Sequence, residues 1–186
     1  MRLFVALNLP KKERERIRRS TKKLRETEMP VRWTDEDHYH VTLKFLGEVR
    51  RERLEDVTKA VHAVAESTKA FKTKLGGFGA FPSVRQPSVI WLGVGATPEL
   101  RLLKQDLEWS FGDIGFEAET RAFHPHVTLG RTDERDGAGA FRGLDEMLAD
   151  LDCRGEVKVN TIELMKSQLS SKGATYTVVS TARLAT

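Results

Sequence analysis

Two histidines lie in copies of the same four-residue motif. His-Val-Thr-Leu occurs at residues 40–43 and again at residues 126–129. In a β-strand, residues i and i+2 project from the same face, so each copy places an imidazole beside a hydroxyl group. Imidazoles titrate at about pH 6.5, so two of them can supply one acid and one base near neutrality. We therefore expect His40 and His126 to be catalytic, with Thr42 and Thr128 beside them.

These groups suit the in-line hydrolysis of a phosphodiester. The attacking water needs a base on one side of phosphorus, and the departing oxygen needs an acid on the other. The two hydroxyls would hold the non-bridging oxygens. Proton transfer and positioning are enough for a labile ester, so we expect no metal and no other cofactor. Lys44 follows Thr42 in the same alternation, and we expect it on the same face as a phosphate contact or as a cation at the rim of the cleft.

Two alternatives remain open from the residues alone. His38-Tyr39-His40 and His124-Pro125-His126 have a spacing that metal ligands also use, so four imidazoles could serve a metal-dependent hydrolase. This reading leaves both threonines unexplained, and Pro125 disturbs the regular alternation. The second alternative is a module that binds a nucleotide or an RNA end without significant turnover.

The hydrophobic pattern predicts strands and helices that alternate in both halves of the chain. In the first half we expect strands at 3–9, 39–46 and 71–75 and helices at 11–26 and 51–68. In the second half we expect strands at 89–94, 126–130, 157–165 and 174–182 and helices at 98–111 and 144–151. Residues 133–143 contain three glycines among charged residues, which is typical of a mobile loop.

The two halves repeat the same order at the same offset. The histidine strands are 126 − 40 = 86 residues apart, and the opening strands are 89 − 3 = 86 residues apart. This agreement indicates an internal duplication. We expect one domain over residues 1–186, made of two pseudo-symmetric lobes at about 1–80 and 81–186, whose terminal strands could be exchanged between the lobes. A pseudo-twofold axis would bring the four motif side chains together in one cleft.

Composition narrows the class of protein. The 186 residues carry 31 Lys and Arg against 27 Asp and Glu, a net charge of +4 that is compatible with a polyanionic substrate. Cys153 is the single cysteine, which excludes an internal disulfide and a cysteine cluster for zinc. No apolar run approaches the roughly 20 residues that span a bilayer, and the N-terminus does not resemble a signal peptide. We expect a cytoplasmic enzyme without a membrane contact.

The sequence resembles the two-histidine phosphoesterase superfamily, and within it the LigT-like RNA 2',3'-cyclic phosphodiesterases, also called 2'-5' RNA ligases. The resemblance covers nearly the whole chain. It rests on these blocks: Arg2-Leu-Phe-Val-Ala-Leu7, residues 33–47, Gly79-Ala-Phe-Pro82, Ile90-Trp-Leu-Gly-Val94, Phe123-His-Pro-His-Val-Thr-Leu-Gly-Arg131, and Leu164-Met-Lys-Ser-Gln-Leu169 with Gly173 and Tyr176. The separate His-x-Thr motifs are weak signals, but their ordered set is specific.

The resemblance implies a bilobal α+β fold, with two antiparallel sheets facing a central cleft and helices on the outside. It implies hydrolysis of RNA 2',3'-cyclic phosphate ends to 2'-phosphomonoesters, with 2'-5' ligation as the reverse reaction. His40 would donate a proton to the departing 3'-oxygen, and His126 would activate water.

The resemblance also implies that Thr42 and Thr128 bind phosphate and that Arg131 assists at the phosphate or the ribose. A regular strand would point Arg131 away from His126. The implied partner is RNA or an oligonucleotide with a cyclic phosphate end, and no obligate protein partner is implied.

Overall fold

The computed structural model describes residues 1–133, 135–137 and 139–186. The expected loop at 133–143 includes residues 134 and 138, which lie outside this description. The strands are β1 (Arg2–Asn8), β2 (Val31–Trp33), β3 (His40–Glu48), β4 (Phe71–Pro82), β5 (Pro87–Val94), β6 (His126–Thr132), β7 (Gly155–Val159), β8 (Thr161–Ser170) and β9 (Gly173–Arg183). The helices are α1 (Lys11–Ser20), α2 (Lys22–Arg25), α3 (Leu54–Glu66), α4 (Pro98–Asp113) and α5 (Leu144–Asp150), with 3-10 turns η1 (Glu36–His38) and η2 (Arg51–Arg53).

Three predicted elements differ from the observed ones. The helix predicted at 11–26 is interrupted at Thr21, whose hydroxyl donates a hydrogen bond to the carbonyl of Ile17. The strand predicted at 157–165 is two strands, because β7 and β8 meet at Asn160 and pair with different partners. The strand predicted at 71–75 continues to Pro82, past a register shift beyond Leu75.

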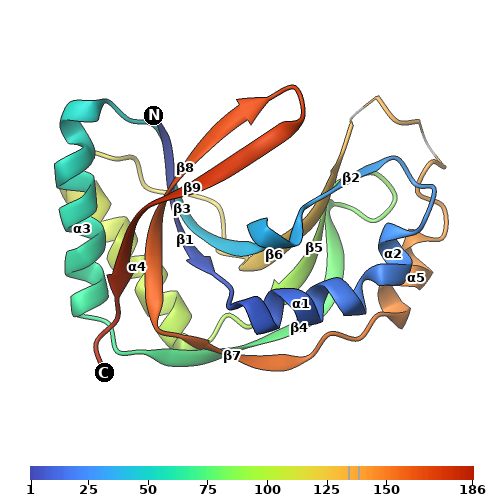
Figure 1. Ribbon diagram of the computed structural model, residues 1–186, viewed down its shortest axis with the longest axis horizontal. Coiled ribbons are helices and arrows are strands. Elements are labelled where there is room, and N and C mark those ends of the chain that lie inside the picture. Colours follow the sequence, from blue (N-terminus) through green and yellow to red (C-terminus); the bar gives the residue numbers. More distant parts are fainter. Residues whose placement is uncertain (134, 138) are drawn as a thin grey trace.

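All paired strands are antiparallel, and the order is β7-β4-β5-β6-β3-β1-β8-β9, with β2 paired to β6. This arrangement confirms the α+β class with antiparallel sheets. We call β3-β1-β8-β9 the first half-sheet and β7-β4-β5-β6 with β2 the second half-sheet. A single residue pair, Val41 with Val127, joins them. In Figure 1 the β8–β9 hairpin and the region around β2 rise on either side of this joint.

The half-sheets do not follow a sequence boundary near residue 80. β4 comes from the N-terminal half of the chain but pairs with β5 and β7. β8 and β9 come from the C-terminal half, and β8 pairs with β1. Strands from each side of the boundary at about residue 80 therefore pair with strands from the other side.

The helices also cross between the halves. α4 follows β5 but packs on β3 and on α3, which itself covers β8 and β9 (Figure 1). α1 follows β1 but reaches the second half-sheet, where the Arg16 side chain donates a hydrogen bond to the carbonyl of Arg154, beside β7. Most of the buried apolar side chains of both halves form one continuous core, while Phe4, Ala6 and Met165 form a separate small cluster with Tyr176. None of the helices in the described part of the chain is long and apolar enough to cross a membrane.

Candidate active site

The joint between the half-sheets relates the two motifs to each other. Val41 and Val127 occupy equivalent positions, 127 − 41 = 86 residues apart, so a local twofold axis passes between them. Because the two strands run antiparallel, the residue before Val41 lies opposite the residue after Val127, and the residue after Val41 lies opposite the residue before Val127. This places His40 beside Thr128 and Thr42 beside His126. We call the side of the sheet from which these four side chains project the histidine face.

A β-bulge follows the first motif and reverses the direction of the next side chain. Ala6 of β1 pairs with Thr42, but its neighbour Val5 pairs with Lys44, so Leu43 is an extra residue on β3. Successive residues of β1 face opposite sides, and Lys44 therefore lies on the side opposite Thr42.

Lys44 is consequently not a phosphate contact, and our expectation for it was wrong. Its side chain is 3% exposed, and its ammonium group is 2.9 Å from a carboxylate oxygen of Glu108 on α4. The same group donates a hydrogen bond of 3.0 Å to the carbonyl of Glu117. Burial opposes ionisation of Glu108, but hydrogen bonds from Lys104 and Lys44 outweigh it and lower the pKa of that carboxyl group.

An equivalent bulge follows the second motif, and it turns Arg131 toward the histidine face. Trp91 of β5 pairs with Thr128, and Val89, two residues earlier on the same face of β5, pairs with Arg131. Arg131 therefore shares the histidine face with Thr128, contrary to the geometry of a regular strand. Its side chain is exposed.

Both imidazoles are held in the same way. The Nδ1 atom of His40 lies 2.7 Å from the carbonyl oxygen of His38, and the Nδ1 atom of His126 lies 2.7 Å from the carbonyl oxygen of His124. A carbonyl oxygen can only accept, so Nδ1 carries the proton in each ring. Nε2 is then the atom that takes up or gives up a proton, as a base when the ring is neutral and as an acid when it is charged.

The surroundings disfavour the charged form of each ring. Burial lowers the pKa of His40 below its ordinary value of 6.5, and electrostatic interaction with His38, Arg131 and His126 lowers it further. Burial also lowers the pKa of His126, and His124 and Arg131 act in the same direction. The hydrogen bonds to the backbone carbonyls oppose these effects in both cases.

One aromatic ring stands edge-on against each histidine. The centroid of Tyr176 is 5.2 Å from that of His40, and the centroid of Phe81 is 5.2 Å from that of His126. Phe4 adds a second ring, 5.3 Å from His40. These aromatic contacts restrict the orientation of each imidazole and cover part of each ring. The motifs alone indicate no role for Phe4 or Phe81, because only strand pairing brings these two rings against the histidines.

Comparison with known proteins places this geometry in a family. The model of the family described as LigT like Phosphoesterase matches residues 7–91 and 94–176. The chain belongs to this family. Two of its relatives are named RNA 2',3'-cyclic phosphodiesterase. The one from Aeropyrum pernix is 32% identical over 87% of this chain and 90% of its own length. The one from Methanothermobacter thermautotrophicus is 28% identical over 99% of both chains.

Solved structures of similar proteins agree with the LigT-like fold over the full chain. A crystal structure of a Thermus thermophilus protein has a TM-score of 0.83 at 27% identity, covering 99% of this chain and 98% of that one. The structure of E. coli LigT complexed with 3'-AMP has a TM-score of 0.78 at 26% identity, covering 100% of this chain and 98% of that one.

The metal-dependent alternative would need a cluster of ligands. Across residues 1–133, 135–137 and 139–186, no group of three or more His, Cys, Asp or Glu side chains is placed to hold a metal ion. The two His-x-His pairs of this LigT-like phosphoesterase therefore belong to no such group within the described residues.

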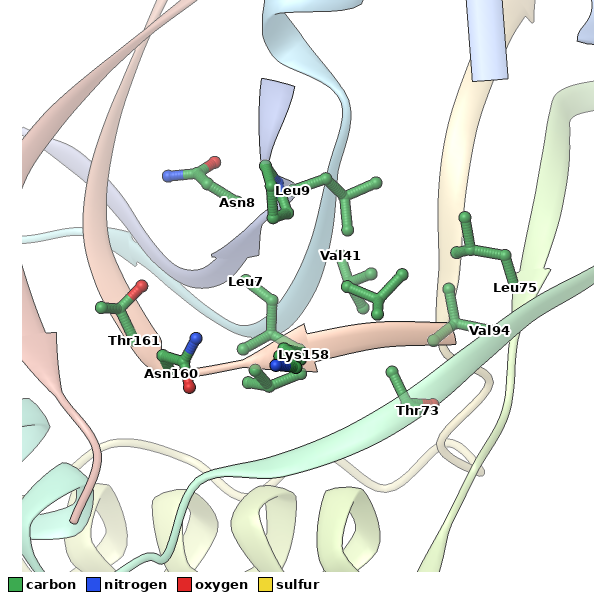
Figure 2. A pocket seen from close by; sticks show the side chains of 13 residues that line it. Leu7, Asn8, Leu9, Val41, Thr73, Leu75, Val94, Lys158, Asn160 and Thr161 are labelled. Atoms are coloured by element: carbon green, nitrogen blue, oxygen red, sulfur yellow. The ribbon is translucent and has the colours of Figure 1, made fainter. Parts of the chain in front are cut away.

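A cavity of about 210 Å³ lies behind the motifs, on the opposite side of the sheet (Figure 2). Val41, which stands between His40 and Thr42, lines it together with Leu7 of β1 and Val94 of β5. None of the motif histidines or threonines lines this cavity. It is therefore a feature of the joint between the half-sheets, separate from the histidine face.

Proposed function

We propose that this chain hydrolyses 2',3'-cyclic phosphate ends of RNA to 2'-phosphomonoesters by two-histidine acid and base catalysis, without a metal ion. One observation carries the proposal: two imidazoles, held identically through Nδ1, project from one face beside a pair of threonines. The names of the relatives from A. pernix and M. thermautotrophicus support this substrate.

In the proposed reaction, Nε2 of neutral His126 takes a proton from water. The water oxygen forms a bond to phosphorus, and the bond from phosphorus to the 3'-oxygen breaks. Nε2–H of charged His40 gives its proton to the departing oxygen, which leaves a 3'-hydroxyl and a 2'-phosphate. The hydroxyls of Thr42 and Thr128 donate hydrogen bonds to the non-bridging oxygens as negative charge develops on them.

The positive charge of Arg131 makes the free site favourable for binding an anion. Arg131 disfavours a proton on either histidine. A bound phosphate anion offsets this repulsion, since a nearby negative charge favours the imidazolium. Substrate binding therefore raises the pKa of His40, so this imidazole is protonated in the complex with substrate.

An assay in excess chelator tests the reaction class, the need for metal and the regiochemistry together. An RNA oligonucleotide with a 2',3'-cyclic phosphate end is incubated with the protein, and ³¹P NMR locates the product phosphate. We expect a 2'-phosphate, and we expect His40→Ala and His126→Ala each to lower the rate by about 10²- to 10⁴-fold. Tight binding without turnover would indicate a binding module, and activity lost on chelation would indicate a metal-dependent hydrolase.

Ligation through a 2'-5' linkage uses the same groups, with the 5'-hydroxyl of a second RNA in place of water. Neutral His126 takes the proton of this hydroxyl, its oxygen forms a bond to phosphorus, the bond from phosphorus to the 3'-oxygen breaks, and charged His40 gives its proton to the 3'-oxygen. Water at its ordinary concentration competes as nucleophile, and we therefore propose hydrolysis as the principal direction.

A further inference from the structure

A second arginine lies directly opposite Arg131. β2 pairs with β6 so that Arg32 faces Arg131, flanked by Val31 with Thr132 and Trp33 with Gly130. Directly opposite residues of an antiparallel pair project from the same side. Because Arg131 lies on the histidine face, Arg32 lies there too, and its side chain is exposed.

The close approach of β2 depends on Gly130. A Cβ atom at this position would lie 2.5 Å from Cγ1 of Val31 and 2.9 Å from Cε3 of Trp33. Any larger residue would force the side chains of Val31 and Trp33 to move. The amide of Thr34 also donates a 2.8 Å hydrogen bond to the carbonyl of Leu129, which continues the pairing toward β3. The backbone thus holds the two arginines side by side.

This pair of like charges costs stability unless an anion lies between or beside them. Within the described residues, neither Arg32 nor Arg131 has an ion-pair partner. Asp133 directly follows β6; Arg135 binds its carboxylate at 2.8 Å, and Arg135 together with the more distant charge of Arg32 holds its pKa at about 2. Because no described carboxylate lies within ion-pair distance of either arginine, the pair can still bind an additional anion.

We infer that Arg32 binds the phosphodiester linkage immediately 5' of the cyclic phosphate, so that oligonucleotides are preferred over cyclic mononucleotides. This inference rests on the proposed function, because a cyclic phosphate at the 3' end leaves the RNA only one direction in which to continue. Arg131 influences both imidazoles, which places its charge near the terminal phosphate. β2 lies along the same edge of β6 as β3 does, so Arg32 extends the positive surface beyond His40.

Three substrates separate this role from a structural one: a nucleoside 2',3'-cyclic phosphate, a dinucleotide with one charged linkage and a cyclic phosphate end, and the same dinucleotide with an uncharged methylphosphonate linkage. We expect Arg32→Gln to lower kcat/KM for the charged dinucleotide by about 10- to 100-fold, the loss of a charge-assisted contact. We expect the other two substrates to change by less than about twofold. Arg32→Lys restores part of the activity, since it keeps the charge but not the planar fork.

Lys158→Ala is the matched control, because Lys158 lies opposite Lys72 in another exposed pair of like charges, on β7 and β4. We expect this variant to keep the kcat/KM of all three substrates. A loss from Arg32→Gln that is equal for all three substrates, or no loss for the charged dinucleotide, would overturn the inference. Failure of the unaltered protein to hydrolyse any of the three would instead reject the proposed function.

Salt dependence provides an independent readout of the same contact. A contact between an arginine and a phosphate weakens as the salt concentration rises. We expect Arg32→Gln to flatten the dependence of kcat/KM on salt concentration for the charged dinucleotide only. An unchanged slope would contradict a contact between Arg32 and the internal phosphate.

Discussion

The two imidazoles are controlled by their immediate neighbours. Backbone carbonyls bind both Nδ1 atoms and leave Nε2 as the atom that can exchange a proton. Burial is the largest cause of the lowered pKa of each ring, and Arg131 adds to it in both. Because both pKa values lie below 6.5 in the free protein, the form with one proton on the pair is most populated on the acidic side of neutrality.

The pH dependence of kcat/KM follows from these directions. We expect a bell-shaped profile whose alkaline limb already falls as the pH rises above about 6.5. Arg131→Gln removes a positive charge and should move this limb to higher pH, although it also lowers the maximum. Steady-state kinetics from about pH 5 to 9 provide the measurement. A limb that stays in place or moves to lower pH would contradict the assigned influence of Arg131.

The two threonines provide a second test at this scale. Thr42→Val and Thr128→Val keep the shape of the side chain and remove the hydroxyl group. We expect each to lower kcat/KM by about 10- to 100-fold, because a hydrogen bond to a charged oxygen contributes about 1.5–3 kcal/mol. Thermal unfolding checks that the fold is retained. Unchanged kinetics in either variant would remove that threonine from the phosphate site.

At the scale of strands, two equivalent bulges decide which side chains lie on the histidine face. Phe45 and Arg131 are 131 − 45 = 86 residues apart, and each follows its bulge onto the histidine face. Phe45 is 60% exposed and lies 6.0 Å from Phe4. The repeated His-Val-Thr-Leu motif could be recognised from the sequence because it is local. The bulges could not, because each extra residue is defined only by its partner strand, and so Lys44 was misplaced and Arg32 was overlooked.

The corrected position of Lys44 leads to a stability prediction. Its ammonium group is buried against Glu108, which also binds Lys104 at 2.8 Å. Lys44→Met should lower the free energy of unfolding by about 1–3 kcal/mol, since a partly buried carboxylate loses one of two cationic partners. Denaturant unfolding measures this loss. The kcat/KM should stay within about twofold of the unaltered value, and a selective loss of activity would return Lys44 to the substrate site.

At the scale of the whole molecule, the halves are interleaved. The duplication was visible in the sequence as a constant offset of 86 residues. The partners of β4, β8 and β9 were not visible, because pairing between distant segments leaves no local pattern. One residue pair joins the half-sheets, yet helices and strands cross between them and share one core.

This interleaving predicts a single cooperative unfolding transition. Trp33 and Trp91 lie in the second half-sheet, whereas Trp109 lies on α4, which packs on the first. Tryptophan fluorescence, circular dichroism and calorimetry should therefore give coincident midpoints, with equal calorimetric and van't Hoff enthalpies. Two separated transitions would show that the halves unfold independently.

The assignment of His40 as the acid and His126 as the base is tested most directly by changing the leaving group. A cyclic substrate in which sulfur replaces the departing 3'-oxygen needs little or no proton donation, because a thiolate is a far better leaving group than an alkoxide. His40→Ala should then recover most of the unaltered rate, while His126→Ala stays inactive for want of a base. Recovery by His126→Ala alone, or equal recovery by both variants, would contradict the account.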